Sequence, residues 1–600
     1  MLRIYRFFHS LLNKKEKKFF IVLQFITLIS SLLELISIAS VVPYLAILID
    51  VEGALENEGL LFLYNLLQFS SQNQFIIYAG LGIISLLFLS TIFSMLANWG
   101  LTRYAFHVGY KLSTRLFGFY IHQPWLYHVN VSSPELIGYI TTEVDRVTSS
   151  VINPLLLMIP RVLLTVLLIT SLIIFNPIAS FITAAIFISS YFVVFSVLKK
   201  YFDLNSINIS KTIPLRFRYL NEGFGGIKEV LIYNMQKMFK TNFETQTRTV
   251  FLYRAMNTVL SVLPRFLIEF LAFASLLGFA VFLFSSNQEA ISTLTTLLVY
   301  AVAAAKLLPA IQQIYFFFGT IQGGTQSFYN VEEQMKKVLQ FESSIEQQNL
   351  ELKPIPFEKE IRLSSVNFQY PGKDDFTVKD LNLTIKKGEI LGLVGPSGSG
   401  KSTIADLLLG LIIPKDGFLS IDGTILEKEN VKNWQKMIGL VPQETFLLDA
   451  SIAENIAFGE NSETIDHEKL NQSIERAGLT EFIDQLSKGV NTNIGEKGLL
   501  ISGGQKQRIG VARAFYRESD FIIFDEATNA QDSITEERIL DSIFSSTNKS
   551  TILLIAHRLS TVKKCDSIVV CDQGEIKDTG SYEDLIVSSK LFKKMVLLNE

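Results

Sequence analysis

Six stretches in the N-terminal part of the chain are long and apolar enough to cross a membrane, and they constrain the fold more than any other feature. A spanning helix needs about 20 mainly apolar residues. The stretches that qualify cover residues 19–49, 75–98, 151–175, 178–198, 258–284 and 290–318. In lipid every backbone N–H and C=O group must be satisfied within the protein, so we expect six helices. The hydrophobic fraction of 49% agrees with a membrane protein that carries soluble parts.

The distribution of Lys and Arg predicts how these spans are oriented. The connection over residues 51–74 and the turns near 176–177 and 285–289 carry no Lys or Arg, which predicts that they face outside. The long connections over 99–150 and 199–257 are rich in Lys and Arg, which predicts that they are cytoplasmic. The N-terminus and everything after the sixth span should then lie in the cytoplasm of a cell whose inner, or plasma, membrane holds the chain.

The two long cytoplasmic connections are too polar for lipid and rich in helix formers, so we interpret them as extensions of the spans. Pro124 interrupts the helical pattern within residues 122–128, and three glycines interrupt it within residues 221–227. Each interruption predicts a turning point with a short transverse helix. The alternative is a cytoplasmic linker with no docking role, although such long structureless loops are uncommon.

A change of composition divides the chain into two domains. Residues 1–340 form the predicted membrane domain, and residues 341–356 are a charged connector without a hydrophobic period. From residue 357 to residue 600, short apolar runs typical of strands alternate with helical ones, as in an α/β domain. The predicted fold is therefore an α-helical transmembrane domain of six spans followed by an α/β phosphate-loop ATPase domain.

A glycine-rich phosphate loop follows the apolar run at 390–394 and opens a helical run at 404–409. Its glycines turn backbone N–H groups toward a phosphate, and the helix points its positive dipole end at the same anion. Lys401 should reach the β- and γ-phosphates of ATP, and the Ser402 hydroxyl should ligate Mg²⁺. The predicted nucleotide-binding residues of this loop are Gly395, Ser397, Gly398, Gly400, Lys401, Ser402 and Thr403.

A second apolar run, over residues 521–524, ends in two carboxylates. Asp525 can lie beside Mg²⁺, and Glu526 can polarise the attacking water as general base. A strand whose acidic end only caps the next helix is the alternative, and an upstream phosphate loop in the same domain disfavours it. Cofactors ATP and Mg²⁺ are therefore expected, and the nearly balanced charges give no reason to expect nucleic acid as a partner.

Residues 501–508 read Ile-Ser-Gly-Gly-Gln-Lys-Gln-Arg, and at this point the chain resembles the ABC transporter family, in particular half-transporter exporters of the type IV fold. The signature of that family is Leu-Ser-Gly-Gly-Gln, which identifies Ser502, Gly503, Gly504 and Gln505 as nucleotide-contacting residues. The resemblance also implies an adenine-stacking role for Tyr370, a magnesium contact for Gln443 and a γ-phosphate contact for His557. Asp532 matches the acidic residue that follows the two carboxylates, although the segment Asn529-Ala530-Gln531 departs from the family pattern Ser-Ala-Leu at its first and third positions.

One phosphate loop covers only one side of a nucleotide, and a second Ser-Gly-Gly helix start supplied by another subunit would close the other side. The chain has one copy of each half. We therefore expect a dimer with two composite ATP sites. A homodimer would have Glu526 and His557 in both sites, and a heterodimer is not excluded by the sequence.

Charged residues inside spans are costly and indicate function. Arg161, Arg265 and Lys306 are candidate ligands for an anionic cargo such as a pyrophosphate head group, because Arg matches phosphate oxygens and stays charged. Glu34 and Glu269 also fall within spans, and a same-helix pair between Arg265 and Glu269 is the alternative for that arginine.

The segment around Glu34, the Pro264-Arg265 pair and the segment 306–309 resemble bacterial ABC flippases that turn over lipid-linked oligosaccharides. The resemblance implies flipping of a polyprenyl-pyrophosphate glycan, and a short external helix over residues 60–68. Export of simple lipids, peptides or hydrophobic drugs is the rival, favoured if Arg265 is paired with Glu269 and the cavity lacks cationic access. A further alternative is an ATP-gated channel or receptor, which intact Glu526 and His557 disfavour.

Overall fold

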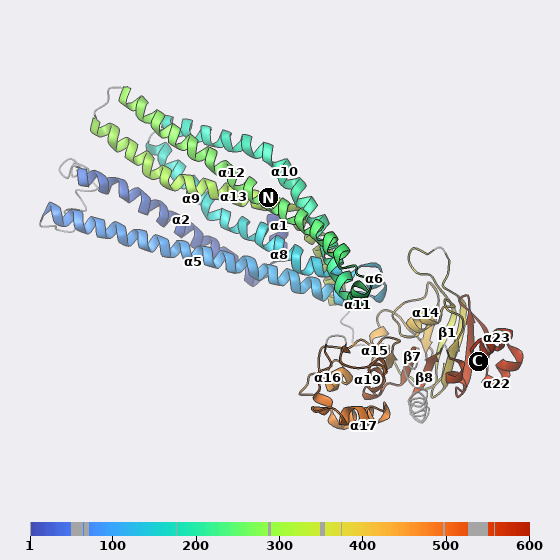
Figure 1. Cartoon of the computed structure of the whole chain (residues 1–600). Helices are drawn as coiled ribbons and strands as arrows, with labels where there is room; N and C mark the ends of the chain where they lie inside the picture. The colour runs from blue at the N-terminus through green and yellow to red at the C-terminus, as the bar shows by residue number, and fades with distance from the viewer. Residues whose placement is uncertain are drawn as a thin grey trace. The chain divides into compact units, whose positions relative to one another are not determined.

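The computed structural model describes most of the chain, which forms two compact units (Figure 1). The first unit comprises Met1–Gln123 and His128–Glu346, and the second comprises Pro124–Tyr127 and Gln347–Glu600. The described residues are 2–49, 64, 71–175, 177–285, 290–347, 355–373, 375–495, 498–525, 550–556 and 558–599.

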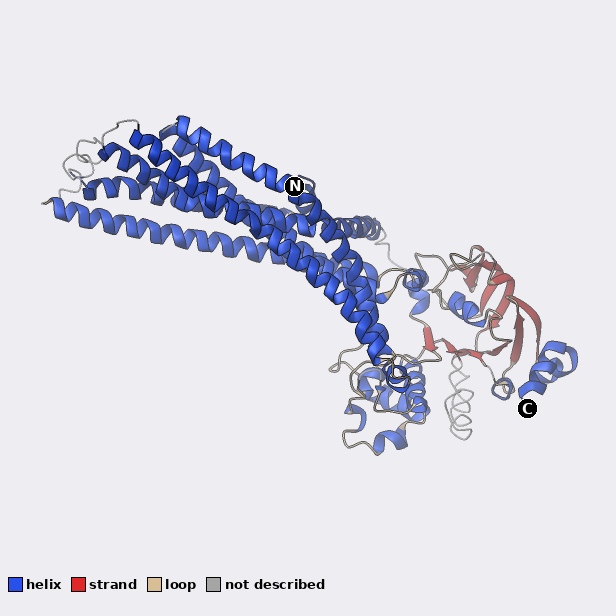
Figure 2. Ribbon diagram, turned by 45° about the horizontal axis from the view of Figure 1, so that its top comes forward, coloured by secondary structure: helices blue, strands red, loops and turns tan. Residues whose placement is uncertain are grey.

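The described part of the first unit is helical, and its long helices run side by side (Figure 2). Helix α2 packs along α5, and α10 packs along α12. The helices are α1 (Leu2–Leu11), α2 (Lys14–Ile49), α5 (Gln72–Ile121), α6 (Trp125–Asn130), α7 (Ser133–Gly138), the π-helix η1 (Tyr139–Glu143), α8 (Val144–Val147), the π-helix η2 (Thr148–Ile152), α9 (Asn153–Phe175), α10 (Pro177–Gly225), α11 (Ile227–Ile232), α12 (Gln236–Ser285) and α13 (Ala290–Gln347).

All six predicted spans lie in these helices. Among the described residues, five segments are long and apolar enough to span a bilayer, and they fall in α2, α5, the run from α7 to α9, α12 and α13. The fourth predicted span lies at the start of α10, where several side chains are outside the described set. The predicted external helix over residues 60–68 also lies outside it, except for Tyr64.

The chain turns at both predicted places. Helix α5 ends before Pro124 and the short α6 follows, while α10 ends at Gly225 and the short α11 follows. The predicted connector over residues 341–356 differs from the structure, because α13 continues to Gln347. Phe341 packs edge-on against Phe119, and Glu342 accepts hydrogen bonds from the Arg115 guanidinium, so contacts with α5 extend the helix.

The second unit is an α/β domain with two sheets. The larger has the strand order β10-β9-β3-β8-β7-β6, parallel except for β10, and the smaller is antiparallel with the order β2-β1-β4-β5. The strands are β1 (Glu360–Phe368), β2 (Val378–Lys386), β3 (Ile390–Val394), β4 (Asp416–Ile421), β5 (Thr424–Ile425), β6 (Ile438–Val441), β7 (Phe521–Asp525), β8 (Thr551–Ile555), β9 (Ser567–Asp572) and β10 (Glu575–Gly580).

Helices cover the larger sheet and a helical subdomain extends from it. These helices are α14 (Lys401–Leu408), α15 (Val431–Gln435), α16 (Ile452–Ile456), α17 (His467–Arg476), α18 (Thr480–Asp484), the 3₁₀-helix η3 (Gly489–Asn491), α19 (Gly503–Tyr516), α21 (Leu559–Val562), α22 (Tyr582–Ser588) and α23 (Lys590–Asn599).

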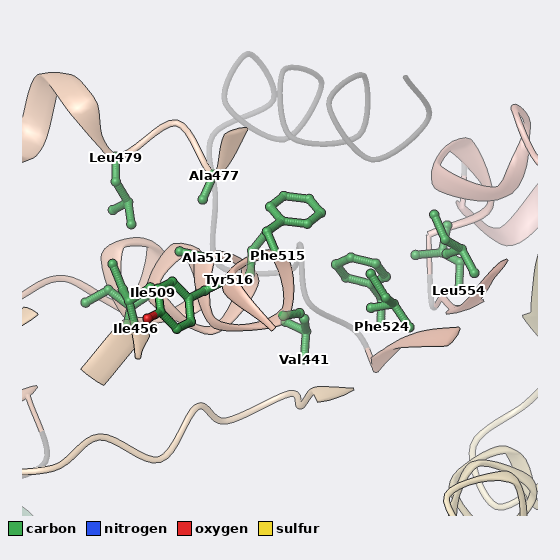
Figure 3. Packing of buried hydrophobic residues seen from close by; sticks show 14 of the residues in the cluster. Val441, Ile456, Ala477, Leu479, Ile509, Ala512, Phe515, Tyr516, Phe524 and Leu554 are labelled. Carbon is green, nitrogen blue, oxygen red and sulfur yellow. The ribbon is translucent and has the colours of Figure 1, made fainter. Parts of the chain in front are cut away.

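A buried apolar cluster joins α19 to the larger sheet (Figure 3). Ile509, Ala512 and Phe515 of α19 belong to the same cluster as Val441 of β6 and Phe524 of β7. Because α19 begins directly after Ser502, this packing holds the Ser-Gly-Gly segment in a fixed place relative to the sheet.

Candidate functional site

The phosphate loop joins β3 to α14, as the sequence predicts. Gly398 has φ 80° and Gly400 has φ 99°, conformations that only glycine adopts without strain. A side chain at Gly395 would collide with the carbonyl oxygen of Cys571 on β9, so that position must also stay glycine. Nothing lies within 4 Å of where a side chain at Gly398 would stand, so the loop is open on that side.

The loop residues suit a polyphosphate. Gly400 has no side chain with which to cap α14, so the first-turn N–H groups of that helix are available to an anion. The buried Lys401 ammonium donates to the carbonyl oxygens of Gly395 at 2.8 Å and Pro396 at 3.0 Å. The Ser399 hydroxyl is buried and has no hydrogen-bond partner among the described residues. The Ser402 side chain is exposed, whereas that of Thr403 is buried.

Tyr370 lies beside the same helix. Its hydroxyl is 3.4 Å from the Thr403 hydroxyl, and its ring meets that of Phe368 edge-on, with centroids 4.9 Å apart. The Lys373 ammonium lies 5.6 Å from the Tyr370 centroid. These contacts fix the orientation of the ring.

Three functional segments meet at the carboxyl edge of the parallel sheet, where such folds bind ligands. Ile555 at the end of β8 pairs with Leu393 of β3 on one side and with Asp525 of β7 on the other. The phosphate loop, Asp525 and the end of β8 therefore leave from neighbouring strand ends. The predicted catalytic residues Glu526 and His557, together with Asp532, lie outside the described residues.

The Ser-Gly-Gly segment begins α19 with a capping box. The Ser502 hydroxyl oxygen accepts the Gln505 N–H at 3.3 Å, and the Gln505 side chain accepts the Ser502 N–H at 2.8 Å. Ser502 and Gly503 are exposed. Because the hydroxyl oxygen acts as acceptor in the cap, its proton remains available to donate to an approaching phosphate.

Gln443 lies just after β6, in an exposed position. It lines a cavity of about 570 Å³ together with Thr445, Gly503 and Lys506. The structure thus brings the predicted magnesium contact and the start of α19 to one cavity of the second unit.

The predicted cargo residues have carboxylate neighbours in the first unit. Arg161 on α9 and Lys306 on α13 approach the same carboxylate, Glu34 on α2, at 3.8 Å and 3.6 Å. Arg265 donates to Glu269 at 2.7 Å, which is the same-helix alternative considered above. Arg161 and Lys306 thus come together, and Arg265 does not join their cluster.

Two groups of functional interest were missed by the sequence reasoning. Asp406 is half-buried on α14, where burial, and then the charge of Asp525, raise its pKa to about 6. Its position on the helix that follows the phosphate loop could have indicated that Asp406 lies near the nucleotide site. Arg146 pairs with Glu143 in the stretch between α7 and α9, and the i,i+3 spacing of opposite charges was the corresponding signal.

The fold and the site define a membrane-embedded protein driven by a phosphate-loop ATPase domain. The comparisons with known proteins then identify it. Residues 59–308 match the family model of the ABC transporter transmembrane region, and residues 378–529 match the family model described as ABC transporter. The chain belongs to the ABC transporter family and is an ATP-driven translocase.

Its relatives include bacterial proteins. The chain is 30% identical over 472 residues to the heterocyst differentiation ATP-binding protein HepA of Nostoc sp., covering 78% of this chain and 75% of that protein. It is 30% identical over 488 residues to the ATP-dependent lipid A-core flippase of Saccharophagus degradans, covering 81% and 80%. The fold matches a bacterial Atm1-family ABC exporter solved with ATP bound, with a TM-score of 0.77, 21% identity and coverage of 96% and 98%.

Proposed function

We propose that the chain works as a dimer that uses ATP to flip an anionic, pyrophosphate-bearing lipid-linked oligosaccharide across the inner membrane. The family supplies the coarser part, an ATP-driven exporter or flippase. The cargo, the dimer, the cytoplasmic placement of the N-terminus and ATPase domain, and the role of each site residue belong to the proposal.

In the proposed engine, Lys401 and the first-turn N–H groups of α14 hold the phosphates while Tyr370 stacks on the adenine. Mg²⁺ would be held by Ser402, Gln443 and Asp525, and when bound it neutralises phosphate charge. Glu526 accepts a proton from the attacking water, and His557 donates a hydrogen bond to the γ-phosphate.

The dimer follows from what one chain offers to a nucleotide. The phosphate loop presents N–H donors from one side only, and the exposed Ser502 at the start of α19 presents a second set that can serve a neighbouring chain. Two copies arranged head to tail would give two closed sites, each with a loop from one chain and Ser502 from the other. Closure around ATP and opening after hydrolysis then supply the two states that transport needs.

The cluster of Glu34, Arg161 and Lys306 carries the assignment of an anionic cargo. Each residue lies near the middle of its predicted span, where an uncompensated charge is expensive. Two cations share one carboxylate, so the cluster keeps an excess positive charge that a phosphate group can neutralise. The relative that flips lipid A-core shows that flipping of glycolipids occurs among the homologues of this chain.

One observation favours the rival cargo of simple lipids, peptides or hydrophobic drugs. Arg265 is paired with Glu269, and Gln312 donates to the same carboxylate at 3.1 Å. This pair cancels its own charge, so it adds nothing to the attraction of an anion. The Arg265 side chain is nevertheless 57% exposed, and Lys306 is 47% exposed, so cationic groups remain accessible in the spans.

The test is translocation in liposomes. Purified protein is supplied with a fluorescent polyprenyl-pyrophosphate glycan and ATP, and movement between leaflets is followed by quenching. We expect ATP-dependent movement that stops in Glu526→Gln and falls when Arg161 or Lys306 is made neutral. Movement that persists unchanged in both of these neutral variants would refute the anionic-cargo assignment, and movement unchanged in Glu526→Gln would refute the powered mechanism.

A further inference from the structure

A polar cavity of about 520 Å³ lies within the first unit, apart from the Glu34 cluster. Its walls come from the stretch around α8, from α10, from α12 and from α13. The volume falls within the range of small-molecule sites, which is roughly 300–1,000 Å³. Arg146, Arg254 and Asn257 line it together with hydroxyl groups, and Asp145 also lines it.

Arg146 is the buried group of this cavity, with a side chain only 10% exposed. Its Nη1 donates to Glu143 at 2.8 Å and to the Ser210 hydroxyl at 2.8 Å. Glu143 also accepts from Asn330 at 3.2 Å, so the carboxylate is well satisfied. The other terminal nitrogen of Arg146, Nη2, is buried without a hydrogen-bond partner among the described residues. A charged donor left in this way is expensive, and the guanidinium that carries it is one of the groups that line the cavity.

Local hydrogen bonds decide which groups on the cavity wall remain available as donors and which remain available as acceptors. The carbonyl oxygen of Asn257 accepts from Asn205 at 2.8 Å, and its NH₂ group faces Gly323, another lining residue. The hydroxyls of Ser261 and Thr320 donate to backbone carbonyls of their own helices, which leaves their oxygens as acceptors. The walls therefore offer guanidinium and amide donors to an anion and hydroxyl acceptors to sugar hydroxyls.

The backbone is irregular at Arg146. The π-helices η1 and η2 stand directly before and after α8, the short helix that carries this residue. Such π-helical segments are rare and are frequent at functional sites. The π-helical backbone is a separate observation from the unsatisfied Nη2 atom, and both observations concern Arg146.

Arg146 and Thr320 of the cavity lie toward the predicted cytoplasmic ends of their helices. At ~1.5 Å of rise per residue, Arg146 lies about 20 Å along the helix axis from Arg161, and Thr320 lies about 20 Å from Lys306. Two helices thus give the same spacing between the cavity and the mid-membrane cluster. The hydrocarbon core extends only about 15 Å from its centre. Arg146 and Thr320, about 20 Å from the middle, are therefore at the head-group level, on the side of the predicted cytoplasmic extensions.

We propose that this cytoplasmic cavity binds the pyrophosphate-bearing head of the cargo before the head reaches the mid-membrane cluster. Arg146 and Arg254 hold the phosphate oxygens, and Asn257 and the lining hydroxyls contact the first sugar. The inference rests on the proposed function and adds a second binding site to it.

Equilibrium binding of farnesyl pyrophosphate to the full-length protein in lipid nanodiscs tests the cavity. Saturating ADP is present throughout, so that the probe cannot bind in the phosphate loop. Farnesol, which has the same chain and no phosphate, reports lipid binding alone, and inorganic pyrophosphate reports the anion alone. Arg254 is exposed, so Arg254→Gln should fold, and Glu143→Gln/Arg146→Gln removes the buried pair together without leaving one charge behind.

We expect Arg254→Gln to weaken binding of farnesyl pyrophosphate by about tenfold or more, because one charge-assisted hydrogen bond is lost. The double variant should weaken binding at least as much. Lys240→Gln, on the same helix and outside the cavity, should bind as the wild type does. Farnesol binding should not change in any variant. If inorganic pyrophosphate displaces farnesyl pyrophosphate at equal concentration, the site binds the anion itself. If displacement needs a much higher concentration of inorganic pyrophosphate, the site binds the lipid head. Both results support the site.

Wild-type affinity for farnesyl pyrophosphate in Arg254→Gln and in the double variant would overturn the inference. Its failure is distinct from failure of the proposed function. If the glycan probe is not translocated but Arg254→Gln still weakens farnesyl pyrophosphate binding, the cargo assignment falls and the cavity stands. If the glycan probe is translocated but both variants bind farnesyl pyrophosphate as the wild type does, the cavity is refuted as a binding site and the cargo assignment is kept.

Discussion

Replacing Glu34 by glutamine separates a structural ion cluster from an anion-binding one. The change removes the carboxylate that Arg161 and Lys306 share, at 3.8 Å and 3.6 Å, while keeping a side chain of the same size. The excess positive charge of the cluster then rises by one unit. If the cluster exists only to balance itself, two cations are left unpaired and the protein loses stability. If it binds an anionic head, the protein holds that head more tightly.

The structure sets the size of the effect. Two unit charges 4 Å apart interact by about 1 kcal/mol in bulk water and about 4 kcal/mol at an effective dielectric of 20. Lys306 is 47% exposed and Arg161 is 23% exposed, so solvent screening keeps the change toward the lower value. A change of about 1 kcal/mol corresponds to roughly a fivefold gain in affinity for the anionic head. Tighter ground-state binding does not lower the barrier to release, so maximal turnover should fall.

The assay is ATP-driven translocation measured against the concentration of the fluorescent polyprenyl-pyrophosphate glycan. Glu34→Gln should lower the half-saturating concentration and the maximal rate together. Arg161→Gln should raise the half-saturating concentration. Glu16→Gln is the matched control, because Glu16 is on the same helix and pairs with Lys111 at 2.6 Å, away from the cluster. An unchanged or raised half-saturating concentration in Glu34→Gln, accompanied by a lower melting temperature, would refute the reasoning.

Three further predictions concern the ATPase domain. Gly400→Ala should cost about 1–2 kcal/mol, because a side chain is placed at φ 99°, and should lower ATP affinity in a nucleotide-binding assay. Ser502→Ala should lower ATPase activity about tenfold or more by removing a phosphate donor, and should cost ~1 kcal/mol through the lost helix cap, read from the melting temperature. Burial raises the pKa of Asp406 from 3.8 to about 6, so the folded state keeps a proton that the unfolded state has lost, and stability falls as the pH rises through that window. Asp406→Asn should remove that slope in melting experiments between pH 4 and pH 7 and stabilise the protein near neutrality by about 1 kcal/mol, a value discounted for partial exposure.

Features that one local segment determines could be predicted from the sequence. The phosphate loop needs glycine at particular dihedral angles, and Gly398 and Gly400 adopt them. The spans follow from length and hydropathy, and the turns at Pro124 and Gly225 follow from residues that interrupt helices. The same-helix pairing of Arg265 and Glu269 follows from their spacing of one helical turn.

Features that need contacts between distant segments were out of reach. Helix α13 passes the predicted boundary because Phe341 and Glu342 meet Phe119 and Arg115 of another helix. The convergence of Arg161 and Lys306 on one carboxylate joins three helices, and no periodicity within any one of them reports it. The orphaned nitrogen of Arg146 depends on side chains from three segments and becomes visible only when all its hydrogen bonds are counted.

The positions of the charges explain why a flippase would carry an anion-binding cluster that contains a carboxylate. A pyrophosphate head that leaves the cytoplasmic cavity must cross hydrocarbon, where an unpaired charge costs several kcal/mol. Cations at mid-membrane lower that cost. Two cations without a carboxylate partner, however, would bind the pyrophosphate head so tightly that it would remain there. Glu34 pairs with both cations. In the proposed mechanism the arriving phosphate exchanges with this carboxylate, and the carboxylate pairs with the cations again when the head leaves. In the proposed mechanism the cluster thus stabilises passage without trapping the cargo, and the energy that moves the head onward comes from closure of the ATPase domains.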